Sequence, residues 1–141
     1  MTRVDFYLLD GTADTAMDMA ACRLAAKAFR LGHRVYIRAR DAEQARTLDR
    51  LLWTFNAGSF VPHALHSEEM DPRMPVVIGE AQMPVELNDV LINLGDNVPE
   101  IFSRFDRVAE IVGGDESSKT NARERFRFYR DRGYPLETHQ L

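Results

Sequence analysis

The stretch RVDFYLLD, residues 3–10, combines β-branched and aromatic residues into a nearly continuous apolar run. Such a run is typical of a strand that is covered on both faces, and we predict a strand over Val4–Leu9. The sequence GTADT, residues 11–15, then reads as a turn. From about Thr15 an alanine- and leucine-rich segment predicts a helix, with its apolar face at Ala21, Leu24, Ala25 and Ala28 and its end at Gly32.

The same alternation repeats directly afterwards. HRVYIRARD, residues 33–41, reads as a second strand, and Asp41 followed by Gln44 is a capping pattern that starts a second helix. The buried stripe of that helix is predicted at Ala45, Leu48 and Leu52. Strand, helix, strand and helix in such quick succession indicate parallel βαβ pairing.

The rest of the chain continues this pattern less regularly. Residues 55–75 carry glycine, serine, asparagine and proline, which favour a long loop or short edge segments. PVVIG (75–79), DVLINLG (89–95) and DRVAEIVG (106–113) read as strands, and PEIFSRF (99–105) as a short helix with Pro99 in its first turn. GGDES (113–117) is expected to cap a last helix, which runs to about Arg132 before Gly133 and Pro135 stop it.

These elements predict a single α/β domain over residues 1–141, with a mostly parallel or mixed sheet and helices on both faces. The architecture is Rossmann-like but lacks a nucleotide-binding loop. The turn after the first strand, LLDGTADT (8–15), has one glycine and cannot supply a G-x-G-x-x-G or phosphate-loop pattern. We therefore expect no cofactor and no enzymatic activity, and a nucleotide-using enzyme is suggested only by analogy of architecture.

Composition narrows the class of protein further. The chain has 45% apolar residues, one cysteine and a net charge of −4. It contains no long apolar run and begins on a strand-like segment rather than on a signal-peptide pattern, so we expect a cytoplasmic protein without a membrane segment. One cysteine excludes an intramolecular disulfide. A pI of about 5.5 argues against general binding of duplex DNA.

No catalytic or metal site emerges from the remaining polar residues. Cys22 lies among alanines and reads as a buried apolar residue rather than a nucleophile. His63 and His66, beside two glutamates, would hold a metal only in an ordered loop, so we expect none. His33 is expected on the surface at the start of a strand, and His139 in the C-terminal tail.

The last helix gathers an unusual amount of positive charge. Between Lys119 and Arg132 there are six cations and two anions. Lys119, Arg123, Arg127 and Arg130 share an arc of about 80° on a helical projection, and Phe126 borders it. A cationic stripe edged by an aromatic ring suits a short acidic peptide with an aromatic end. A solvated helix face, and a direct binder of single-stranded nucleic acid, are the alternatives.

A second unusual segment is LLWTFNAGSFVPH, residues 51–63. Trp53, Phe55 and Phe60 follow one another closely, and Val61 and Pro62 come next, in a place where a loop would carry polar residues. Some of these side chains must enter the core. The rest would form an exposed patch of the kind that binds another protein.

Together these segments resemble a known family. FYLLD (6–10), GHRVYI (32–37), LDRLLW (48–53), SFVPH (59–63) and SSKTNARERFRFYRDRGY (117–134) are similar to the chi subunits of bacterial DNA polymerase III holoenzyme, which belong to the clamp-loader complex. The resemblance implies an α/β fold without catalytic activity that serves as a replisome adaptor. One face would bind the psi subunit, and the other the acidic, aromatic-ended C-terminal tail of single-stranded DNA-binding protein, so that DNA contact is indirect.

The resemblance also assigns residues to both surfaces. For the tail it implies Lys119, Arg123 and Arg127 as cations, with Phe126 and Val112 forming an apolar pocket. Some relatives have a tyrosine in place of Phe126 and a lysine in place of Arg127, changes that keep the ring and the charge. For the psi subunit it implies the residues around the second aromatic segment, namely Phe60, Trp53, Val61 and Pro62.

Overall fold

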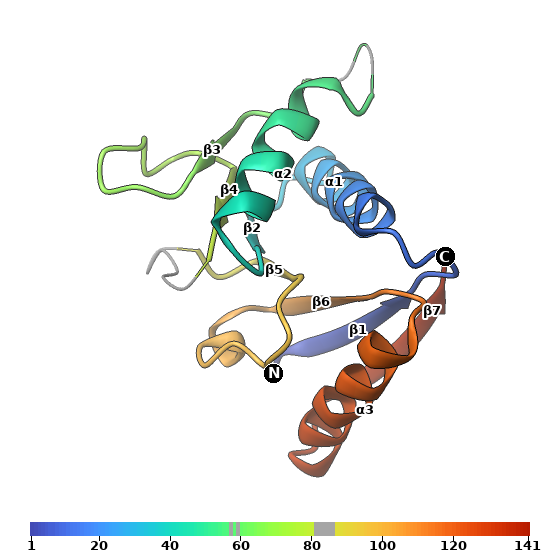
Figure 1. Ribbon diagram of the computed structural model, residues 1–141. Coiled ribbons are helices and arrows are strands. Elements are labelled where there is room, and N and C mark those ends of the chain that lie inside the picture. Colours follow the sequence, from blue (N-terminus) through green and yellow to red (C-terminus); the bar gives the residue numbers. More distant parts are fainter. Residues whose placement is uncertain (57, 59, 81–86) are drawn as a thin grey trace.

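The computed structural model describes residues 1–56, 58, 60–80 and 87–141 (Figure 1). Ala57, Ser59 and residues 81–86 lie outside the described part, so the segment 51–63 is described without two of its members. The elements, in chain order, are β1 (Arg3–Leu8), α1 (Asp14–Arg30), β2 (Val35–Arg38), α2 (Ala42–Thr54), β3 (His63–Leu65), β4 (Val76–Gly79), β5 (Val90–Asn93), the 3-10 turn η1 (Phe102–Arg104), β6 (Arg107–Val112), α3 (Glu116–Asp131) and β7 (Leu136–Gln140).

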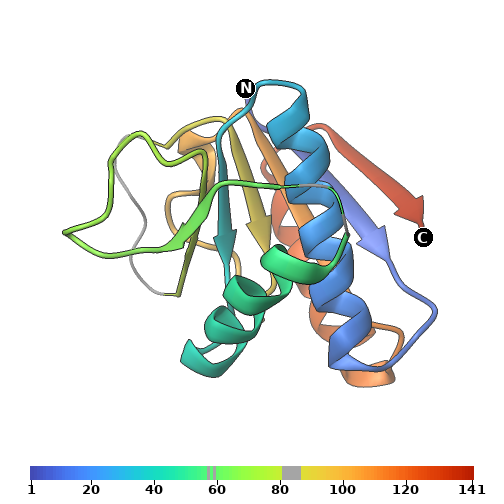
Figure 2. The same ribbon diagram turned by 90° about the horizontal axis from the view of Figure 1, so that it is seen from above.

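Within the described residues these strands form one seven-stranded sheet in the order β3-β4-β2-β5-β6-β1-β7. Every neighbouring pair is parallel. Helices α1 and α2 cover one face and α3 covers the other, as Figures 1 and 2 show from two directions. The predicted α/β class, with helices on both faces of the sheet, is therefore confirmed, and the sheet is parallel rather than mixed.

Two apolar layers hold the helices on the sheet. Alternate side chains of each strand point to opposite faces, so Ile37 and Ile92 pack under α1 and α2, while Phe6 and Leu91 pack on the side of α3. This two-sided burial is the reason why the strands read as nearly continuous apolar runs.

The predicted starts of α2 and α3, and the predicted end of α3, agree with the structure. At the start of α2 the Asp41 carboxylate accepts a hydrogen bond from the Gln44 amide at 2.8 Å, and the Gln44 side chain accepts one from the Arg40 amide at 2.7 Å. The Asp115 side chain accepts a bond from the Ser118 amide at 3.0 Å and starts α3. Gly133, which follows α3, has a φ of +79°, a conformation that glycine adopts without strain.

The sequence did not predict β7, and the assignment of His139 to a free tail is wrong. Residues 136–140 pair with β1 as the edge strand of the sheet. The His139 ring stacks on Tyr7 with centroids 4.8 Å apart, and its Nε2 lies 2.9 Å from an Asp5 carboxylate oxygen. The sequence LETHQ lacks an apolar run because an edge strand exposes much of its surface, and this removed the usual strand signal.

The other differences are small. PEIFSRF forms only the single 3-10 turn η1 instead of a short α-helix. Within residues 55–75, the short parallel strand β3 at the opposite edge of the sheet is one of the expected edge segments. Among the described residues, no helix is both long and apolar enough to cross a membrane.

Candidate functional site

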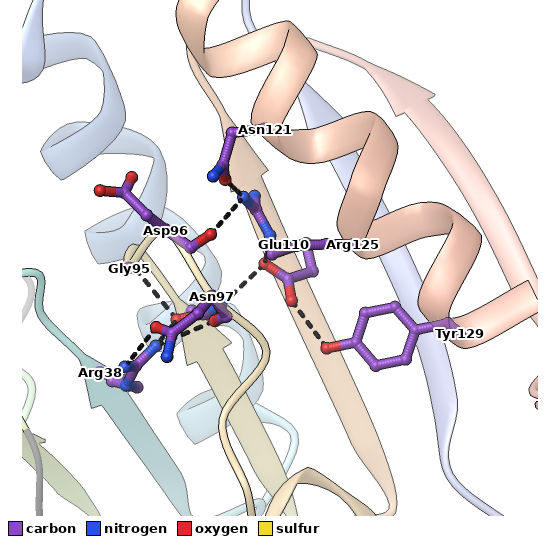
Figure 3. Close-up of polar contacts among 9 residues, drawn as sticks. Arg38, Gly95, Asp96, Asn97, Glu110, Asn121, Arg125 and Tyr129 are labelled. Carbon is purple, nitrogen blue, oxygen red and sulfur yellow. Dashed lines mark hydrogen bonds and ion pairs between the residues drawn. The ribbon is translucent and has the colours of Figure 1, made fainter.

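A buried polar cluster fixes α3 on the sheet (Figure 3). Glu110 in the middle of β6 is fully buried, and its Oε1 lies 3.1 Å from the Nε of Arg125 in α3. The hydroxyl of Tyr129 donates to the other carboxylate oxygen at 2.7 Å. Burial, together with the charge and the hydrogen bond of Glu110, raises the pKa of the Tyr129 hydroxyl above its ordinary value of 10.0.

The cluster continues across the C-terminal ends of the neighbouring strands. Asn93 of β5 donates to Glu110 at 2.9 Å, and its side-chain oxygen accepts a bond from Arg38 of β2 at 3.0 Å. Arg38 in turn donates to the Asn97 side chain at 2.8 Å. Arg125 is therefore a structural residue, although it lies in the most cationic segment of the chain, and it is not one of the four cations of the predicted stripe.

With α3 fixed in this way, an open cleft of about 410 Å³ lies between the helix and the edge of the sheet. Its surface comes from α3 on one side, from β1 and β7 on the other, and from the end of β6. The residues that line it are Phe6, Leu8, Leu9, Asp10, Val112, Gly113, Lys119, Ala122, Arg123, Phe126, Thr138 and Gln140. We call this feature the α3–β7 cleft.

Four of the five residues expected to bind the tail meet in the α3–β7 cleft. Val112 is the last residue of β6 and only 3% exposed, and Phe126 is half-buried and packs edge-on against Phe6 with centroids 5.4 Å apart. Lys119 and Arg123 add cations from α3. The fifth, Arg127, is exposed on the same helix but does not line the cleft.

The two cations of the cleft, and the neighbouring Arg127, are available to a ligand. In the described part of the chain, Lys119, Arg123 and Arg127 make no ion pair or side-chain hydrogen bond. Arg130 of the predicted stripe differs, because its Nη2 forms an ion pair with the Oδ1 of Asp131 at 3.2 Å. An apolar floor beside unpaired guanidinium and ammonium groups can hold a carboxylate and an apolar side chain at the same time.

The far wall of the cleft was not predicted from the sequence. Phe6 and Leu8 come from β1 and were expected only as core, and Thr138 and Gln140 come from β7, which carries no strand signal. An exposed polar segment after the last helix gives no indication of its position until its pairing with β1 is known.

At the end of the sheet where dinucleotide-binding folds hold phosphate, the turns after β1 and β6 contact each other. The Gly114 amide donates to the Gly11 carbonyl at 2.9 Å, so the turn after β6 packs against the turn after β1. A Cβ on Gly114 would lie only 2.4 Å from the Asp10 carbonyl oxygen. Glycine is therefore needed here for turn-to-turn packing rather than as part of a phosphate cradle.

A second exposed feature lies at the end of α2. Trp53 is 58% and Phe60 is 62% exposed, and their rings contact each other with centroids 5.4 Å apart. Pro62 is half-buried beside them, whereas Val61 is 1% exposed and belongs to the core beneath. We call Trp53 and Phe60 the α2 aromatic patch.

His63, which was expected in a loop, is buried in the structure. The ring nitrogens of buried His63 lie 2.7 Å from the Val61 carbonyl and 2.9 Å from the Asp49 carbonyl, and its ring supports Trp53 edge-on. Within the described ranges, one group has a geometry that could hold a metal, namely Asp5, Glu137 and His139. Arginines already neutralise the two carboxylates of this group. The Nε of Arg107 lies 2.8 Å from the Oδ2 of Asp5, and the Nη2 of Arg3 lies 2.8 Å from the Oε2 of Glu137.

Comparison with known proteins gives consistent relatives over the whole chain. The family described as DNA polymerase III chi subunit, HolC, matches residues 1–137. The DNA polymerase III subunit chi of Pseudomonas aeruginosa is 43% identical over 141 residues, which cover 100% of this chain and 98% of that protein. The subunit chi of Escherichia coli is 38% identical over 143 residues, covering 98% and 97% respectively. That of Haemophilus influenzae is 32% identical over 137 residues, covering 96% and 95%.

Among solved structures, the fold is similar to that of T4 UvsW, with a TM-score of 0.70 over 99% of this chain and 41% of that chain. The identity is 8%, so this likeness concerns the fold alone. The family match, by contrast, includes α3 and the α2 aromatic patch, and the match to the Pseudomonas aeruginosa subunit covers the whole chain, with β7 included. The chain therefore belongs to the family of DNA polymerase III chi subunits.

Proposed function

We propose that the protein is a non-catalytic adaptor that links the clamp loader, through the psi subunit, to the acidic C-terminal tail of single-stranded DNA-binding protein. Membership of the chi family gives the chain an accessory role in DNA replication. The two linkages are our proposal, and the α3–β7 cleft is the observation that carries it. Its contact with DNA is indirect in this account, and it acts in the cytoplasm.

The chemistry of the cleft suits the tail. Carboxylates of the tail pair with Lys119 and Arg123 at the α3 side, where neither cation forms an ion pair with the described residues. The terminal aromatic ring of the tail enters beside Phe126, over the apolar floor that Phe6 and Val112 provide. Exposed charge pairs are screened by salt, so binding is expected to be modest and to weaken as ionic strength rises.

The α2 aromatic patch suits the psi subunit. Trp53 and Phe60 are large apolar side chains that remain mostly exposed, which is unusual unless another molecule covers them. The patch follows α2, and α2 and α3 lie on opposite faces of the sheet (Figures 1 and 2). The two partners therefore do not compete for the same surface, as an adaptor requires.

Reconstitution of a three-component complex tests this function. We expect the wild-type chain to co-sediment with psi and with single-stranded DNA-binding protein at the same time. Arg123→Ala should lose only the second partner and Phe60→Ala only the first, so each variant is the control for the other. Loss of both partners from either single variant, with its fold intact, would contradict two independent surfaces.

Binding of a single-stranded oligonucleotide is a further outcome that the experiment separates. The exposed cations of α3 could contact phosphates directly. If the chain bound oligonucleotide as tightly as it binds the tail, in the absence of any partner, the adaptor account of the α3–β7 cleft would be wrong.

A further inference from the structure

We infer that Asp10 determines which acidic peptides the α3–β7 cleft accepts, and in which direction they lie; this inference rests on the proposed function. Among the described residues that line the cleft, Asp10 is the one anion. The cations of the cleft, Lys119 and Arg123, come from α3, whereas Asp10 follows β1 on the opposite side. The cleft therefore has a cationic side and an anionic end.

The position of Asp10 is fixed by the fold. Its carbonyl oxygen packs against Gly114, and the neighbouring Gly11 carbonyl accepts a hydrogen bond from the Gly114 amide at 2.9 Å. Just before it, the Leu9 amide donates to the Val112 carbonyl at 2.9 Å. The segment cannot swing away from the cleft without breaking the contact between these two turns.

The carboxylate of Asp10 is not neutralised. Its partner in the described part of the chain is the uncharged side chain of Gln140, which donates to Oδ1 at 3.4 Å. This contrasts with Asp5, the other aspartate of the same segment, whose carboxylate is bonded to Arg107 and to His139. Asp10 is exposed and lines the cleft, so its carboxylate adds negative charge beside the apolar floor, where it acts on a ligand that approaches.

This charge distribution makes the cleft selective for one kind of peptide end. Anionic groups of a ligand are attracted to Arg123 and Lys119 and repelled by Asp10, so they lie along α3. The apolar side chain of the last residue then points toward Phe6 and Leu8. A peptide with a further acidic residue after its aromatic residue would have to place one carboxylate toward Asp10, and its binding is penalised.

The selectivity can be measured with two labelled peptides, an acidic peptide that ends in an aromatic residue and the same peptide extended by one aspartate. We compare the wild-type chain with Asp10→Asn and with the matched control Glu124→Gln. Glu124 is exposed on α3 and does not line the cleft. Its replacement by glutamine changes the net charge by the same amount as Asp10→Asn, but outside the cleft. Thermal unfolding of all three proteins verifies that the fold is unchanged.

Asp10→Asn should bind the extended peptide about two- to fivefold more tightly than the wild type does, the range expected of one exposed charge interaction. The gain in affinity for the unextended peptide should be smaller. Glu124→Gln should change the affinity for each peptide by less than Asp10→Asn does. Equal effects of both variants would mean that only net charge matters and would overturn the role of Asp10. Failure of the wild type to bind either peptide would overturn the proposed function as well.

Discussion

The Nε of Arg125 lies 3.1 Å from the Oε1 of Glu110, inside the contact between α3 and β6 (Figure 3). This pair sets Arg125 apart from the exposed arginines of the last helix. One arginine holds the helix on the sheet, while Arg123 and Arg127 remain exposed and unpaired among the described residues. The rotation of α3 that the pair sets is also the rotation that turns Phe126 and Arg123 into the α3–β7 cleft.

Breaking the buried pair on one side should be costly. Arg125→Met leaves the Glu110 carboxylate buried without its counter-charge, and we expect the free energy of unfolding to fall by about 3–5 kcal/mol. The double variant Arg125→Met/Glu110→Leu should be more stable than this single variant, because it removes the orphaned charge. Urea denaturation measures both.

The control variant is Arg132→Met, which removes an exposed arginine stacked on Phe128 and should lower the free energy of unfolding by about 1 kcal/mol or less. Equal stability of the single and the double variant would contradict the role of the pair.

Substitutions in the cleft should weaken tail binding without unfolding the protein. Arg123→Ala removes an exposed cation and Phe126→Ala a half-buried ring, and each should cost about 1–3 kcal/mol of binding free energy in calorimetric titrations with a tail peptide. Arg127→Ala should cost less, because Arg127 lies outside the residues that line the cleft. Arg23→Ala, on the exposed side of α1, removes the same charge elsewhere and serves as the control. Unchanged affinity in both cleft variants would show that the tail binds at another place.

The α2 aromatic patch should be specific for the other partner. Phe60→Ala should lower the affinity for psi by about 1–3 kcal/mol, since a large exposed ring at an interface commonly contributes this much. Its affinity for the tail peptide should stay unchanged. Leu65→Ala, which removes an apolar side chain that is 38% exposed on β3, is the comparison in the same assay. Full retention of psi by the Phe60 variant would place the psi surface elsewhere on the molecule.

The ion pairs on β1 should make stability depend on pH in acid. Burial alone would raise the pKa of the Asp5 carboxyl, but hydrogen bonds from His139 and Arg107 and the nearby arginine charges outweigh it and hold this pKa below its ordinary value of 3.8. The ionised carboxylate is thus preferred in the folded state. Its stabilisation is present above about pH 4 and is lost as the pH falls through the lowered pKa. In urea denaturation, the difference in the free energy of unfolding between wild type and Asp5→Asn should shrink over this range. A difference that stays constant would contradict the account.

The single thiol should be inert in the folded protein. Cys22 is completely buried in the layer between α1 and the sheet, and this burial raises the pKa of its thiol to about 12. Only the thiolate reacts at a useful rate. A chromogenic disulfide reagent at mildly alkaline pH should therefore modify the protein only when denaturant unfolds it. Fast modification of the native chain would mean that α1 opens locally.

Much of the fold could be read from the sequence because the two faces of the sheet are buried. The apolar runs at β1 and β2 and the alanine-rich face of α1 admit few other arrangements. By contrast, β7 consists of residues that suit solvent as well as an edge strand, so its position follows only from pairing with β1. The far wall of the cleft, with Thr138 and Gln140, was lost with it.

The candidate site was predicted in part for a similar reason. Helical periodicity was enough to place Lys119, Arg123 and Phe126 on one side of α3. It could not show that Arg125 is buried, because its partner Glu110 lies on a different element. One signal was nevertheless present, since a glutamate in the middle of the apolar run RVAEIV requires a partner for its charge.

The most direct test of the adaptor account is the fluorescence anisotropy of a labelled tail peptide from the cognate single-stranded DNA-binding protein, titrated with the wild-type chain at two salt concentrations. The same peptide without its last residue and a labelled single-stranded oligonucleotide are measured beside it. The account predicts saturable binding of the complete tail only, weakened by salt. Binding of the oligonucleotide with the tail left unbound would contradict it and show that α3 contacts nucleic acid directly.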